Sequence, residues 1–144
     1  MTSAAILYDY DAPLAVRTVA LNPPRDNEIV VGIKATGLCH TDLSVMQGKL
    51  PFPPPVVLGH EGAGVVEKVG ARVTKVKPGD HVALSWNSCG ACPSCKSGNE
   101  PYCDNLFLYN FNGARPDGTT TLRKGNQVIY GSFFCQSSFA NYAL

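Results

Sequence analysis

The sequence has little charge and no long hydrophobic run. Its 144 residues include 12 Lys and Arg against 11 Asp and Glu, so the formal net charge is +1. A balance this close to neutral gives no electrostatic reason to expect nucleic acid or an anionic membrane as a partner. No apolar run approaches the roughly 20 residues that span a bilayer. The segment Met1–Ala5 also lacks the basic and apolar regions of a signal peptide. We therefore expect a cytoplasmic protein.

Helical periodicity is also scarce, and short runs of apolar and β-branched residues dominate instead. Separated by Gly, Pro, Asn and Asp, these runs predict strands over residues 3–8, 16–21, 28–36, 65–69, 73–76, 81–84, 128–130 and 139–144. A single short helix is expected to end near Gln47, with Thr41 or Asp42 as its cap. Residues 104–127 are expected to be irregular. One mainly β domain, a barrel or a sandwich, is the predicted fold class.

The most specific pattern is formed by Cys89, Cys92, Cys95 and Cys103. Three interpretations compete for it. Disulfides would close loops of only two residues between successive cysteines, and nothing marks the chain as secreted. An iron–sulfur cluster would suit the first three cysteines, but the bacterial ferredoxin run places its fourth cysteine closer and follows it with proline. A closed tetrahedral zinc site with four thiolates is favoured.

A closed site with four protein ligands does no chemistry itself, so reactive residues must lie elsewhere in the chain. Two candidates are Cys39 and His60. Each lies in a glycine-flanked turn after an apolar run. Cysteine and histidine with one position left open to water form a ligand set that catalytic zinc uses. Taken alone, however, a cysteine is more often a small buried apolar residue, and a histidine more often an ordinary polar one. These two residues by themselves leave the question open.

The segments around these residues occur in a distinctive order: Gly37–Asp42, Gly59–Gly64, Lys77–Val82, and the cysteine loop. Together they closely resemble the catalytic domain of the zinc-dependent medium-chain alcohol dehydrogenases. Two later segments, Asn110–Gly118 and Phe133–Ala140, resemble the aryl- or benzyl-alcohol dehydrogenase branch of that family.

The resemblance implies a fold and a domain organisation. The fold would be a GroES-like, mainly β, partly open barrel with a structural-zinc loop and few short helices. Residues 1–144 would form this zinc-binding catalytic domain, without the Rossmann domain that normally binds NAD. The full-length protein is expected to form a homodimer or a homotetramer. Whether NAD or NADP is used depends on a residue after the dinucleotide fingerprint, which this sequence does not contain.

The resemblance also implies a catalytic zinc site. Cys39 and His60 match its first two ligands, and Glu61 matches an acidic neighbour that sometimes replaces a ligand. The family's third protein ligand is a cysteine in a motif that Cys135 does not occupy. The catalytic zinc site is therefore expected to be incomplete within this sequence.

Neighbouring residues match roles in proton transfer and cofactor binding. Thr41 matches a hydroxyl that carries the proton away, and Asp42 matches a carboxylate that orients the ring of His60. His40 matches a basic position that meets the cofactor pyrophosphate. Ser44 stands where many relatives have a histidine that completes the proton relay, so the proton exit route stays open.

The function implied by this resemblance is NAD-dependent oxidation of primary, aromatic alcohols to aldehydes by the full-length protein. Trp86 and the Leu50–Phe52 segment are expected to contribute apolar pocket walls. Two alternatives remain: a related enzyme such as S-(hydroxymethyl)glutathione dehydrogenase, or a stand-alone zinc-binding module. Residues 1–144 alone are expected to have no appreciable activity.

Overall fold

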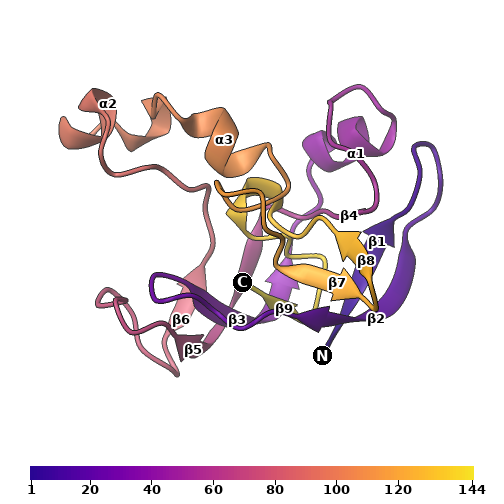
Figure 1. The fold of residues 1–144 in the computed structure, drawn as a ribbon, viewed down its shortest axis with the longest axis horizontal. Coiled ribbons are helices and arrows are strands. Elements are labelled where there is room, and N and C mark those ends of the chain that lie inside the picture. Colours follow the sequence, from indigo (N-terminus) through magenta and orange to yellow (C-terminus); the bar gives the residue numbers. More distant parts are fainter.

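The computed structural model describes residues 1–144 and is built mainly from short strands (Figure 1). The strands are β1 (Thr2–Leu7), β2 (Ala15–Leu21), β3 (Ile29–Thr36), β4 (Val56–Val57), β5 (Gly62–Val69), β6 (His81–Ala83), β7 (Leu122–Lys124), β8 (Gln127–Ile129) and β9 (Tyr142–Ala143). The helices are α1 (His40–Met46), α2 (Pro93–Lys96) and α3 (Leu106–Asn110), with 3₁₀ turns η1 (Glu100–Tyr102) and η2 (Phe133–Cys135). None of the helices has the length and apolar character that crossing a bilayer requires.

The strands form two sheets that meet at the C-terminal segment. One sheet has the order β4-β1-β2-β7-β8 and the other β6-β5-β3-β9. Ahead of β9, Phe139 O accepts the N–H of Ala5 in β1 at 2.9 Å, and Asn141 O accepts the N–H of Ile33 in β3 at 2.9 Å. This bridge closes most of the gap between the sheets. The result is the mainly β, partly open barrel that the sequence predicts.

The core lies on both faces of β1. Ile6 points into a cluster with Val19, Val57, Leu122 and Ile129, whereas its neighbour Leu7 packs with a second cluster. The second cluster also holds Val45, Phe52, Val56, Leu58 and Phe133. Successive residues of a strand face opposite sides, so one strand serves both clusters. The second cluster lies beneath α1 and fixes the position from which the helix presents its first turn.

Strand β5 begins at Gly62, earlier than the predicted start at Val65. Gly64 permits this because β5 approaches β3 closely at that position. A Cβ atom on Gly64 would lie 2.2 Å from the carbonyl oxygen of Gly32. The pairing between β3 and β5 is also interrupted by register shifts after Val30 and Ile33. Burial along β3 does not alternate strictly, since Val30, Val31 and Gly32 are all buried.

Two sequence predictions of secondary structure are wrong. Residues 73–76 form no strand, because this stretch belongs to a turn in which Val73 N–H donates to Gly70 O at 3.1 Å. Residues 104–127 are not wholly irregular, since they contain α3 and β7. The two-residue strand β4 has no counterpart in the prediction. β4 is short and pairs with the distant β1, which local pattern does not reveal, whereas β7 pairs both with the distant β2 and with the adjacent β8 in a hairpin.

Candidate metal centres

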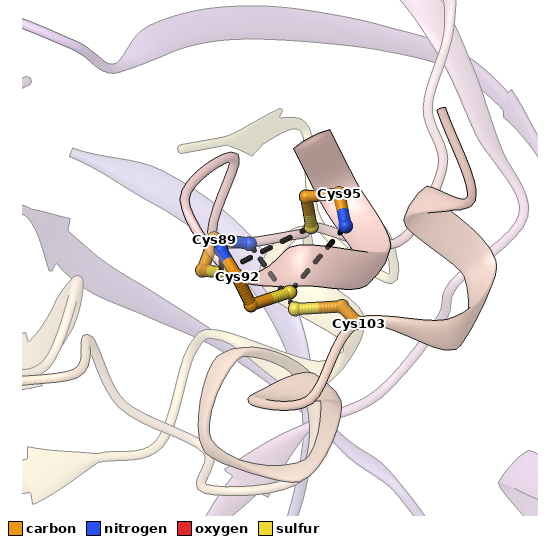
Figure 2. A group of neighbouring side chains, drawn as sticks. All are labelled: Cys89, Cys92, Cys95 and Cys103. Atoms are coloured by element: carbon orange, nitrogen blue, oxygen red, sulfur yellow. Dashed lines mark hydrogen bonds between the residues drawn. The ribbon is translucent and has the colours of Figure 1, made fainter. Parts of the chain in front are cut away.

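The Cys₄ loop, residues 89–103, projects from the barrel together with α2 and α3 (Figure 1). The sulfur atoms of Cys89, Cys92, Cys95 and Cys103 lie within 4.8 Å of one another. Figure 2 shows the four side chains converging on one point between α2 and the following turn. All are free thiols, and the Cys89 and Cys95 sulfurs are 3.9 Å apart. A disulfide would bring two sulfurs to about 2.05 Å, so the disulfide interpretation has no support.

Backbone N–H groups point at these sulfurs, which suits thiolates. Cys89 Sγ accepts from the N–H of Cys92 at 3.3 Å, and Cys92 Sγ accepts from the N–H of Cys95 at 3.4 Å. Cys103 Sγ accepts from the N–H of Cys89 at 3.3 Å. Donors aimed at sulfur stabilise its negative charge. Four such sulfurs fit a tetrahedral zinc ion.

The thiols of the Cys₄ loop differ in proton affinity. Hydrogen bonds, first from the backbone N–H of Ala91 and then from Asn105 and Cys92, lower the pKa of Cys89 to about 6. Burial raises the pKa of Cys95 to about 12. Without metal, neutral pH therefore favours the thiolate at Cys89 and the protonated thiol at Cys95. A metal that takes all four sulfurs must displace that proton.

Asn110 ties the Cys₄ loop to the rest of the chain. Its side chain is fully buried at the end of α3. It accepts the N–H of Asn87 at 2.8 Å and donates to Asn87 O at 2.8 Å and to Leu106 O at 2.9 Å. The amide thus pairs with the backbone just before Cys89 as a neighbouring strand would. This fixes where the loop leaves the barrel.

A second group of ligands, the open cluster, consists of Cys39, His60 and Glu61. Their ligand atoms lie within 4.8 Å of one another. Cys39 lies just before α1, whereas His60 and Glu61 lie between β4 and β5. Glu61 is exposed, and the side chain of His60 is 13% exposed. One thiol, one imidazole and one carboxylate, reachable from solvent, fit a zinc ion with a position left for substrate.

Asp42 connects the two halves of the open cluster. It is 3% exposed, and its carboxylate accepts the N–H of Cys39 at 3.1 Å and the N–H of Gly59 at 2.9 Å. The same carboxylate lies 3.4 Å from Nδ1 of His60, which leaves Nε2 as the ring nitrogen available to a metal. Gly59 adopts a φ of 90°, a conformation that glycine reaches without strain.

The helix cap differs from the sequence prediction. Cys39, not Thr41 or Asp42, is the N-cap of α1, and Asp42 completes the capping box from the third helical position. Thr41 lies beside the cluster, with Oγ1 3.4 Å from Cys39 Sγ. His40 is exposed at the start of the helix, and Ser44 is half-buried one turn further on.

Aromatic rings that sequence reasoning did not assign to the site enclose His60. Phe134 stacks on the imidazole with centroids 4.6 Å apart and planes at 24°. Phe133 meets it edge-on at 5.4 Å, and Phe111 packs against Phe134 at 4.8 Å. The segment Phe133–Ala140 stood out in the sequence only through its resemblance to relatives. Nothing in its local pattern shows that it returns to His60.

The residues expected as pocket walls lie elsewhere. Phe52 is buried in the core behind Phe133, with ring centroids 4.8 Å apart. Trp86 is 49% exposed and lines a separate cavity of about 470 Å³, together with Arg115 and Cys135. No residue of the open cluster lines that cavity. The apolar surface around His60 comes instead from the phenylalanines of η2 and α3.

Comparison with known proteins shows which family shares this sequence and fold. The family described as "Alcohol dehydrogenase GroES-like domain" matches residues 25–121. Among curated proteins, a geraniol dehydrogenase of Castellaniella defragrans is 44% identical over 142 residues, covering 98% of this chain and 38% of its own. An S-(hydroxymethyl)glutathione dehydrogenase of Candida maltosa is 40% identical over 144 residues, covering 98% of this chain and 37% of its own.

Two solved structures share the fold almost throughout. An alcohol dehydrogenase zinc-binding domain protein from Burkholderia ambifaria superposes with a TM-score of 0.96 at 47% identity, covering 99% of this chain and 39% of that one. A benzyl alcohol dehydrogenase from Acinetobacter calcoaceticus gives 0.91 at 42% identity, covering 99% and 38%. This chain thus spans less than two fifths of the length of these relatives. Because the family match covers most of the chain and both structures follow its fold, the chain belongs to the GroES-like domain family of the alcohol dehydrogenases.

Proposed function

We propose that this chain is the catalytic domain of an NAD-dependent zinc alcohol dehydrogenase that oxidises primary aromatic alcohols. The observation that carries the proposal is the open cluster, in which Cys39, His60 and Glu61 bring their ligand atoms within 4.8 Å of one another. The zinc ion of the Cys₄ loop has a structural role in this proposal, because four protein sulfurs leave no position for a substrate.

Each residue around the open cluster has a definable task. Cys39 and His60 would hold a zinc ion, which would supply Lewis-acid chemistry toward an alcohol oxygen and so lower the affinity of that oxygen for its proton. Asp42 orients the ring of His60 through Nδ1. Thr41 Oγ1, 3.4 Å from Cys39 Sγ, is placed to take the released proton outward. The buried Asp42 also keeps Cys39 and His60 at a fixed separation.

The preference for aromatic alcohols is supported by the rings beside His60. Phe111 and Phe134 form an apolar wall next to the ligand, with the buried Phe133 packed behind them. Burying an aromatic ring against such a wall gains about 25 cal/mol per Å² of apolar surface removed from water, which a two-carbon alcohol cannot match. Similarity to a benzyl alcohol dehydrogenase points the same way. Similarity to a geraniol dehydrogenase is consistent with an apolar pocket that is not strictly aromatic.

The hydride acceptor in the proposal is NAD, the cofactor that carries the redox chemistry. Its binding domain would be a further part of the same protein, since relatives are more than twice as long as this chain. His40, exposed at the start of α1 beside Cys39, is proposed to meet the cofactor pyrophosphate. We expect residues 1–144 alone to show no NAD-dependent turnover.

The test compares kcat/KM for benzyl alcohol, ethanol and S-(hydroxymethyl)glutathione, with NAD, in the complete protein that contains this chain. We expect benzyl alcohol to have the highest value and Cys39→Ser to abolish the activity. A preference for S-(hydroxymethyl)glutathione would instead favour the second candidate, to which the similarity to the Candida maltosa enzyme already points. If the protein oxidises none of the three compounds although its metal sites are intact, a zinc-binding module is the only remaining candidate. That result would overturn the proposal.

A further inference from the structure

Gln136 is a buried amide that belongs to no part of the machinery described so far. It is 3% exposed and lies just after η2. Its Nε2 donates to the carbonyl oxygen of His60 at 2.9 Å, and its Oε1 accepts the N–H of Gly62 at 3.1 Å. The carbonyl of His60 and the N–H of Gly62 belong to the two peptide units on either side of Glu61. One side chain therefore holds both peptide planes that set the backbone of Glu61.

Other contacts fix the opposite edge of the same turn. Glu61 O accepts the N–H of Gly37 at 3.1 Å, and Gly62 O accepts the N–H of Leu84 at 2.8 Å. The side chain of Glu61 itself is exposed at the surface. Its carboxylate reaches the open cluster only because the backbone beneath it points in that direction. Any rotation of these two peptide planes would therefore move the carboxylate of Glu61.

The segment that carries Gln136 is itself held in an unusual conformation. Phe134, Cys135 and Ser137 have φ values of 48°, 58° and 50°. Non-glycine residues in this region are strained, and they persist where surrounding contacts determine the backbone. Ser137 supplies such contacts, since its Oγ accepts the N–H of Phe133 at 2.9 Å and donates to Val57 O at 2.6 Å. This conformation directs Phe134 onto the ring of His60 and Gln136 onto the backbone behind it.

From these contacts we propose that Gln136 is a positioning residue that aims the carboxylate of Glu61 at the metal of the open cluster. The inference rests on the proposed function only in that it requires the open cluster to bind metal. Gln136 touches neither substrate nor metal. It acts through Glu61, by fixing the peptide units before and after that residue.

The experiment measures Co²⁺ binding by visible absorption, in protein whose Cys₄ loop has first been filled with one equivalent of zinc. Zinc binds such sites more tightly than Co²⁺, so the cobalt reports on the open cluster. Gln136→Met keeps the length of the side chain but removes both hydrogen bonds. The matched control is Gln127→Met, the same change at an exposed position of β8.

We expect Gln136→Met to weaken Co²⁺ binding about tenfold, at the lower end of the effect that partners of metal ligands have. The spectrum should shift, and hydrogen exchange at the Gly62 amide should accelerate. Gln127→Met should change none of the three. A purely structural role would lower stability but leave the cobalt spectrum unchanged.

A double-mutant cycle with Glu61→Gln tests the route of the effect. If Gln136 acts through Glu61, adding Gln136→Met to Glu61→Gln should cause little further loss of Co²⁺ affinity. If the losses of Co²⁺ affinity from the two substitutions simply add, the inference is overturned. It is also overturned if Gln136→Met keeps the affinity and the spectrum of the wild type. Should Gln136→Met fail to fold, Gln136→Glu is judged by the same cycle, since it keeps the acceptor for Gly62 and loses the donor to His60.

His60→Ala separates failure of this inference from failure of the proposed function. If His60→Ala leaves Co²⁺ binding unchanged, the open cluster is not the metal site and both proposals fail. If His60→Ala abolishes binding while Gln136→Met does not alter it, the metal site stands and only the role of Gln136 is wrong.

Discussion

The Cys₄ loop takes all four sulfurs from residues 89–103, whereas the open cluster draws its ligands from turns that lie far apart along the chain. In the loop, backbone N–H groups of the loop itself stabilise the sulfurs. In the open cluster, the supporting groups come from other elements: Asp42 from α1, and Gln136 and Phe134 from the segment around η2. The closed cluster of four sulfurs is thus encoded locally, while the open cluster depends on the whole barrel for its geometry.

The largest effect is expected from Cys92→Ser. Structural zinc sites are worth about 10–16 kcal/mol of apparent binding free energy, and a hydroxyl replaces a thiolate poorly. The variant should lose the tightly bound zinc and expose residues 89–103 to proteolysis. Limited proteolysis followed by mass spectrometry locates the cleavage. Because the open cluster is held by the barrel, its Co²⁺ affinity should be retained; loss of both sites together would contradict the independence of the two regions.

Asp42→Ala should weaken metal binding at the open cluster and leave the Cys₄ loop intact. It removes the acceptor for Cys39 N–H and Gly59 N–H and the partner of His60 Nδ1. Loss of such a partner weakens metal binding about 10–100-fold. Calorimetric titration of the open cluster measures this, with the zinc content of the Cys₄ loop as internal control. Unchanged affinity would show that Asp42 serves only as part of the helix cap.

Asn110→Ala should weaken the Cys₄ loop by a smaller amount. The substitution leaves the N–H and carbonyl of Asn87 without their partner, and an unsatisfied buried polar group costs about 1–3 kcal/mol. Thermal unfolding should show reduced stability, with faster zinc release from the loop to a chelator. The cobalt spectrum of the open cluster should stay as in the wild type. A shifted spectrum would mean that the loop also governs the open cluster.

Acid should release zinc from the Cys₄ loop gradually. Burial raises the pKa of Cys95 to about 12, so zinc binding at neutral pH displaces the proton of that thiol. Each displaced proton lowers the apparent zinc affinity about tenfold per unit of falling pH. The pKa of Cys89, about 6, means that a further proton competes only in more acidic solution. Titrations in buffers of different ionisation enthalpy count the protons; none released near pH 7 would contradict the prediction.

The contrast between the two metal sites also explains which features could be predicted from the sequence. The spacing of Cys89, Cys92, Cys95 and Cys103 predicts a metal loop because all the relevant contacts are local. The mainly β class followed from many short apolar runs. β4 was missed because it has two residues and pairs with the distant β1, whereas β7 was missed although it forms a hairpin with the adjacent β8. At the open cluster, local pattern offered Cys39 and His60 only as candidates, and the assignment of them and of Glu61 to a metal site came from family resemblance.

The supporting residues of the open cluster were harder to foresee. A glutamine in an apolar stretch carries no local signal, and the return of Gln136 to His60 exists only in the folded barrel. Cys39 became the helix cap in place of Thr41 or Asp42, because Asp42 turns back to the N–H of Cys39 as it meets His60. The first feature rests on a contact between distant segments, whereas the second is a local capping box between Cys39 and Asp42.

The most direct test of the two-site account is a metal count by native mass spectrometry during stepwise addition of zinc and then of a chelator. We expect one zinc that resists the chelator and is lost in Cys92→Ser, and a second that binds weakly and is lost in His60→Ala. A single site emptied by both substitutions, or iron with visible absorption in the Cys₄ loop, would contradict the account.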